Sequence, residues 1–176
     1  MPDRDLLRAW LRQADCDLTA ARVAEPGILE CHQRYWLQQA CEKGVKALGM
    51  LLWRTPSADD GCFRREFLHK HSPLRNLKET PGIPKSLISL LRELEAELAK
   101  LDGRGLLMKV DSTTPTFHPM DVSYRYPFED SAGQVIAPAD YERWDVYQGN
   151  IEGITAAIDR FLKAVRNRSK AERNPR

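Results

Sequence analysis

The sequence of 176 residues predicts a single all-α domain built from four long helices. Two observations support this fold class. Four long segments carry apolar residues at offsets of three, four and seven, which is the repeat of one face of an α-helix. Helix-breaking residues separate these segments, namely Pro26-Gly27 after the first and Pro81, Gly82 and Pro84 before the third. A chain of this length is one domain of ordinary size and can bury a substantial core.

The apolar repeats set the bounds of the long helices. The first repeat includes Leu7, Leu11 and Leu18, and the third places leucines at every third or fourth position up to Leu101. Gly103 then ends that helix. From these repeats we expect the four long helices at residues 2–23, 28–53, 85–101 and 138–166.

Three further segments join or follow the long helices. Residues 54–72 contain Pro and Gly and lack a repeat, which indicates a loop, and residues 73–78 form a short helix that begins with a proline. Residues 106–137 are rich in proline and predict a long ordered loop before the last helix, of a kind that is often functional. The helical domain is therefore expected to cover residues 1–166, followed by a basic, disordered tail at 167–176.

The helix at residues 28–53 is expected to be central. Ala40 and Gly44 fall on its apolar face, where small residues usually let another backbone approach closely. Glu42 lies four residues before Lys46, a spacing that favours an ion pair on one side of a helix. A polar row, which is usually a solvated face, takes the other side of the helix: Gln39, Glu42, Lys43 and Lys46.

Composition restricts the class of protein. The 27 basic and 25 acidic residues give a net charge of +2, so the surface is mixed and any basic site must be local. The four cysteines lack a Cys-x-x-Cys pair, which favours a reduced compartment. No apolar run approaches the roughly 20 residues that span a membrane. We therefore expect a cytoplasmic protein without a targeting segment or membrane association.

Several well-known catalytic motifs are absent from the sequence. The four histidines, His32, His69, His71 and His118, do not have the ligand spacing of a zinc site, so neither a metal nor a cofactor is expected. The phosphate loop of Walker type, the Gly-x-Gly-x-x-Gly fingerprint and the Gly-x-Ser-x-Gly motif are also missing. Nucleotide-driven motors and nucleophilic hydrolases therefore lack support.

Two short segments could bind an anion. His71 stands just before the start of the short helix, and the positive end of a helix attracts anions. Arg125 lies between two tyrosines, which offers a guanidinium for phosphate and rings for base stacking. Alternatively, His71 bonds a carbonyl at the start of the helix and Arg125 satisfies carbonyls in an ordered loop. The expected ligand-binding residues are His71, Arg75, Arg125, Tyr126 and Lys46.

Four short motifs follow one another along the chain: Asp15-x-Asp17-Leu18-x-x-Ala21, Gln39-x-x-Glu42-Lys43-x-x-Lys46-Ala47, His71 followed by Leu74 and Leu77, and Arg125-Tyr126-Pro127. In this order they resemble the HEPN domain, a helical family named for nucleotide binding in higher eukaryotes and prokaryotes. The resemblance covers residues 6–165. It implies an up-and-down helical bundle that commonly dimerises and is often encoded beside a minimal nucleotidyltransferase in toxin–antitoxin-like pairs.

The resemblance also raises the question of RNA cleavage. Many members of the family are metal-independent ribonucleases with an arginine followed, after four to six residues, by a histidine near the final helices. Here the last helix has no histidine, and such pairs occur only early, as Arg64 with His69 and Arg65 with His71. Cleavage needs a base as well as a cation, so the placement does not favour catalysis.

The sequence thus supports three hypotheses. The first is a module that binds nucleotide or RNA, acts with a nucleotidyltransferase-like partner in a toxin–antitoxin or defence system, and does not cleave RNA. The second is a metal-independent ribonuclease that uses Arg65 and His71. The third is a non-catalytic dimerisation scaffold. A homodimer, or a heterodimer with the partner, is expected in addition because apolar residues occupy more than one side of the first and last helices, among them Leu6, Trp10, Trp144 and Tyr147.

Overall fold

The computed structural model confirms the all-α class. It describes residues 4–23, 30–52, 83–101, 128–129, 133–137, 140 and 151–171. Within these residues, two strands of two residues each form a small antiparallel ladder, in which Phe128 pairs with Ile136 and Glu129 with Val135. The long elements are the helices α1 (Arg4–Arg22), α2 (Glu30–Leu52), α5 (Lys85–Leu101) and α6 (Ile151–Ala171), and the strands are β1 (Phe128–Glu129) and β2 (Val135–Ile136).

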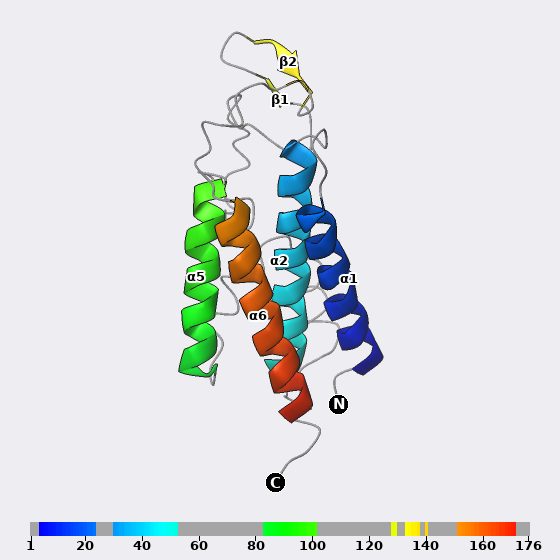
Figure 1. Cartoon of the computed structure of the whole chain (residues 1–176), viewed down its shortest axis with the longest axis vertical. Coiled ribbons are helices and arrows are strands. Elements are labelled where there is room, and N and C mark those ends of the chain that lie inside the picture. The colour runs from blue at the N-terminus through cyan, green and yellow to red at the C-terminus, as the bar shows by residue number, and fades with distance from the viewer. Residues whose placement is uncertain are drawn as a thin grey trace.

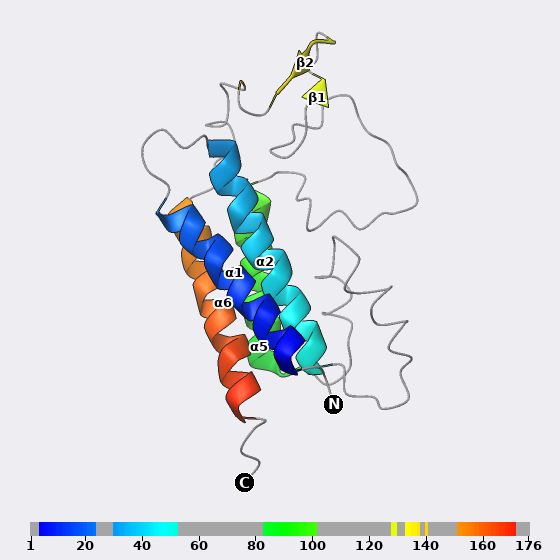
Figure 2. The same ribbon diagram turned by 90° about the vertical axis from the view of Figure 1, so that its right-hand side faces the viewer.

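The four helices lie side by side and alternate in direction (Figure 1). Helices α1 and α5 run one way along the long axis of the molecule, and α2 and α6 run the other way. The amino end of α1 and the carboxyl end of α6 therefore lie at the same end of the molecule. Figure 2 shows from a second side that α1 packs along α2 and α6.

The predicted bounds of the first three long helices agree with the structure to within two residues, whereas the predicted end of the last helix does not. Helix α5 begins and ends at the predicted residues, and the ends of α1 and α2 differ by at most two residues. Helix α6 continues to Ala171, so residues 167–171, which we assigned to a disordered tail, are helical and that assignment is wrong. Arg168 and Lys170 stabilise this last turn because cations favour the carboxyl end of a helix. The short helix at 73–78, most of the loop at 106–137 and the first part of the predicted last helix lie outside the described residues.

The core is built from the predicted apolar faces. Phe161 and Leu162 of α6 are fully buried, as are Leu91 and Leu94 of α5. Helix α1 contributes a regular buried stripe along its length: Leu7, Leu11, Ala14, Leu18 and Ala21.

The surface of α1 offers less apolar area than the homodimer prediction assumed. Leu6 and Trp10 pack, partly buried, against the core of their own chain. Among the described residues, the exposed large hydrophobic side chains are Val23 and Val135. Trp144 and Tyr147 lie outside the described residues, so the homodimer stays a prediction.

Helix α2 is buried along most of its length, and Gly44 lies where it contacts α6. A Cβ atom at Gly44 would lie 2.6 Å from Cδ2 of Leu162 and 3.2 Å from Cε1 of Phe161. We expected a backbone to approach this glycine, but two side chains of α6 occupy the space instead. Gly44 therefore fixes how deeply α6 packs against α2.

Candidate functional site

A row of four polar side chains is buried along α2. Arg34, Gln38, Glu42 and Lys46 follow one another at intervals of four residues, which places them on one slowly winding side of the helix. Their exposed fractions are 2%, 2%, 5% and 4%, respectively. We call these four residues the α2 polar row.

Glu42 and Lys46 of the α2 polar row lie on the side of the helix opposite Gly44. Each is two residues from Gly44, which corresponds to a rotation of about 200° around an α-helix. Because Gly44 faces α6, these two side chains face away from it. The prediction of a solvated face for Glu42 and Lys46 is wrong, since both side chains are buried. The helical repeat separates polar from apolar residues but does not show what covers each side.

Lys46 makes two contacts within the buried row. Its Nζ lies 2.6 Å from Oε1 of Glu42, in an ion pair whose side chains are 5% and 7% exposed. The same Nζ lies 5.4 Å from the centroid of the Trp10 ring on α1, within the range of a cation–π contact. The ammonium of Lys46 is thus held between a carboxylate and an aromatic ring.

Gln38 leaves one polar atom unsatisfied. Its Oε1 is buried and has no hydrogen-bond partner among the described residues. An unpaired buried acceptor costs about 1–3 kcal/mol, so such an atom in a native core calls for an explanation. Together with the Lys46 ammonium, it makes the α2 polar row a place where charge and hydrogen-bonding capacity are concentrated inside a helical core.

The first two motifs of the family resemblance contact each other. Lys43 of α2 forms an ion pair with Asp17 of α1, and Asp15 of α1 forms one with Arg166 of α6 at 2.9 Å. Three residues of these two motifs, Asp15, Asp17 and Lys43, therefore connect the helices. Arg166 could not be recognised as the partner of Asp15 from the sequence, because the two residues are 151 positions apart.

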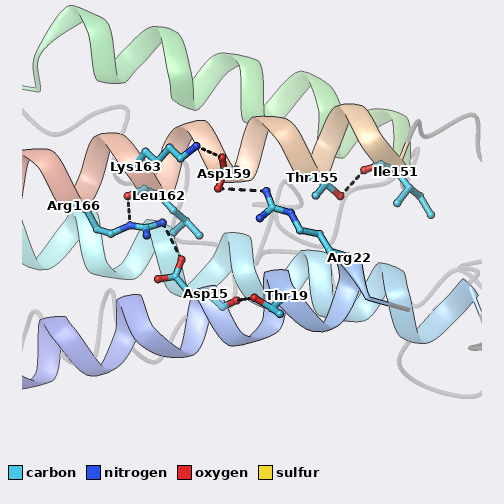
Figure 3. A network of polar contacts seen from close by, with 9 residues as sticks. All are labelled: Asp15, Thr19, Arg22, Ile151, Thr155, Asp159, Leu162, Lys163 and Arg166. Carbon is cyan, nitrogen blue, oxygen red and sulfur yellow. Dashed lines mark hydrogen bonds and ion pairs between the residues drawn. The ribbon is translucent and has the colours of Figure 1, made fainter. Parts of the chain in front are cut away.

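A polar network connects α1 and α6 along their length (Figure 3). Asp159 of α6 lies 3.3 Å from Arg22 of α1 and 2.7 Å from Lys163 of its own helix. Nearer the end of α6, Arg166 contacts Asp15 and its Nε donates a hydrogen bond to the Leu162 carbonyl. The hydrogen bond from Lys163, assisted by the charge of Arg22, holds the pKa of Asp159 below its ordinary value of 3.8.

Asp159→Asn should therefore make stability less dependent on pH at the acid end. Because folding lowers the pKa of this carboxyl, its contribution is present above pH 3.8 and is lost as the pH falls further. At neutral pH the variant should lose up to about 1 kcal/mol, since the ion pairs are partly exposed. Urea unfolding at a series of pH values measures the difference from wild type. A difference that stays constant down to acidic pH contradicts the prediction.

Most of the predicted ligand residues fall outside the described residues. These are His71, Arg75, Arg125 and Tyr126, together with Arg65 of the alternative catalytic pair. Lys46 is described, and it is buried and paired. That Arg125, His71 and Lys46 bind a ligand stays a prediction.

Other kinds of chemistry find no support in the described part of the chain. Burial, assisted by the Glu42 carboxylate, raises the pKa of the Cys41 thiol far above its ordinary value, so the sulfur stays protonated and is a poor nucleophile. The described residues contain no cluster of three or more His, Cys, Asp or Glu side chains suited to a metal ion. None of the described helices is long and apolar enough to cross a membrane. In comparisons with protein-family models, curated proteins and solved structures, the chain matches none of them.

Proposed function

We propose that this chain is a HEPN-like helical module that binds nucleotide or RNA and acts with a nucleotidyltransferase-like partner in a toxin–antitoxin or defence system, without cleaving RNA itself. The observation that carries the proposal is the α2 polar row. Glu42 and Lys46 belong to the motif that resembles the family, and both are buried in the helical core.

The chemistry of the row favours a binding module over a scaffold. A core that served stability alone would gain little from a buried ion pair, because apolar side chains of similar volume are often as stable or more stable. A buried ion pair is therefore weak evidence for a purely structural role. A lysine ammonium, the Trp10 ring and the Gln38 amide are also the groups that recognise phosphate, base face and base edge in nucleotides.

The test measures binding of ATP and of a labelled single-stranded RNA to the variant E42Q/K46M. This double substitution removes both charges but nearly preserves side-chain volume, so the fold should survive, as checked by circular dichroism. We expect binding of one or both ligands to weaken about tenfold, which corresponds to about 1.4 kcal/mol. The matched control is D159N/K163M, a pair with the same spacing on α6 whose lysine is 67% exposed, which should bind like wild type.

Two further results bear on the same proposal. Arg125→Ala should weaken RNA binding and lower the salt dependence by about 0.7 in the logarithmic slope, as expected for one phosphate contact with a single strand. The RNA recovered from the incubations should be intact. If wild type binds neither ATP nor RNA, the proposed function is wrong. If it binds and E42Q/K46M binds equally well, the α2 polar row has no part in recognition.

A further inference from the structure

The ion pairs between α1 and α6 fix the register of the two helices. Asp15 contacts Arg166, and seven residues further along α1 Arg22 contacts Asp159, seven residues earlier on α6. This is the register of two antiparallel helices over two turns. Continued one turn toward the amino end of α1, it places Arg12 opposite residue 169 and therefore beside Lys170.

At this next position the pattern of opposite charges ends. Arg12 and Lys170 are both exposed cations, and no ion pair of either is found among the described residues. Arg8 lies one turn nearer the amino end on the same side of α1, and it makes an exposed contact of 3.4 Å with Asp5. We call Arg8, Arg12 and Lys170 the α1–α6 basic end.

The charge at this end is high compared with the rest of the chain. Residues 4–15 and 164–171 together hold six basic and two acidic side chains, whereas the whole chain has a net charge of only +2. The amino end of α1 and the carboxyl end of α6 lie at the same end of the molecule (Figure 1). The basic end is therefore the kind of local positive surface that a nearly neutral chain needs for binding a polyanion.

We infer that the α1–α6 basic end binds the sugar–phosphate backbone of single-stranded RNA. An arginine guanidinium can donate two parallel hydrogen bonds to phosphate oxygens. A phosphate between Arg12 and Lys170 would supply the negative charge that Asp15 and Asp159 supply further along the two helices. The inference rests on the proposed function for the choice of RNA as ligand. It concerns a different surface from the α2 polar row.

The observations favour RNA over an anionic membrane or a protein as the partner of this surface. Binding to an anionic membrane uses apolar side chains that insert beside the basic ones, and a protein interface is anchored by exposed aromatic or apolar groups. Among the described residues, the exposed large hydrophobic side chains are Val23, at the other end of α1, and Val135. The basic end thus offers cations without apolar anchors, which suits a phosphate backbone.

The test compares R12A/K170A with R92E in the full-length protein. Both variants lower the net charge by two, and Arg92 is exposed on α5, where it makes no ion pair among the described residues. The probe is a fluorescently labelled oligouridine, titrated at several salt concentrations. R12A/K170A should bind about tenfold or more weakly, with a logarithmic salt slope lower by about 1.4 for two lost phosphate contacts. R92E should bind within about twofold of wild type.

Other outcomes overturn the inference in distinguishable ways. If R12A/K170A and R92E weaken binding equally, only net charge matters and the surface is not a site. If R12A/K170A binds normally while E42Q/K46M does not, the basic end is excluded and the proposed function stands. If wild type does not bind oligouridine, the inference is wrong; retained binding of ATP would then leave nucleotide binding as the function. If instead phosphatidylserine vesicles bind wild type but not R12A/K170A, the surface serves a membrane.

Discussion

Replacing Lys46 with methionine is expected to lower the free energy of unfolding by about 3–5 kcal/mol. The substitution nearly preserves volume but removes the ammonium that lies 2.6 Å from the buried Glu42 carboxylate. It also removes the ammonium from the face of the Trp10 ring. Taking the opposite charge away from a buried carboxylate costs free energy. Urea unfolding followed by far-ultraviolet circular dichroism measures the loss.

The chain contains a matched control for this experiment. Asp159 and Lys163 form an ion pair with the same spacing of four residues, but the Lys163 side chain is 67% exposed. Lys163→Met should cost no more than about 0.5 kcal/mol. Adding Glu42→Gln to Lys46→Met should recover most of the loss, because the pair is then removed as a whole. A loss for Lys46→Met as small as that for Lys163→Met means that the pair is solvated in solution.

Gly44→Val should lower the free energy of unfolding by about 2–3 kcal/mol, as overpacking of a filled core does. Already the first added carbon would lie 2.6 Å from Cδ2 of Leu162 and 3.2 Å from the Phe161 ring. Both of these residues are fully buried, so neither can move into open space. Helix propensity alone predicts the opposite sign, because valine is a better helix former than glycine. The sign of the change, again measured by urea unfolding, therefore decides which effect is larger.

Two further variants test the cause of this loss. Ala96→Val on the exposed side of α5 introduces valine without crowding and should cost only about 0.5 kcal/mol. Leu162→Ala alone should lower the free energy of unfolding by about 2–5 kcal/mol. The double variant with Gly44→Val should lose less than the sum of the two single losses, because the valine fills part of the vacated space. Strict additivity contradicts the contact between α2 and α6 at this point.

The sequence predicted the helices because their signal is local. Leucines at helical spacing from Leu87 to Leu94 identify the buried side of α5 without knowledge of its neighbours, and Gly103 indicates where the helix ends. The end of α6 was missed for a related reason. Arg166, Arg168 and Lys170 carry no apolar repeat, although they are good helix formers and favour the carboxyl end of a helix.

The partners of polar groups could not be predicted in the same way. The contact of Asp17 with Lys43 spans 26 positions and that of Asp15 with Arg166 spans 151, so both depend on how the helices pack. The burial of Glu42 and Lys46 is also a property of the packed helices. Their spacing predicted the ion pair correctly, but the spacing is the same for a solvated pair such as Asp159 with Lys163.

The network between α1 and α6 also restricts how the chain can assemble. On α1 the acidic Asp15 precedes the basic Arg22, and on α6 the acidic Asp159 precedes the basic Arg166. Antiparallel packing brings opposite charges together, whereas parallel packing in register, or a slide of two turns, would set Asp15 against Asp159. Like charges held together oppose such arrangements even where each ion pair adds little to stability. The order of four charges thus selects the direction and the register in which the last helix joins the first.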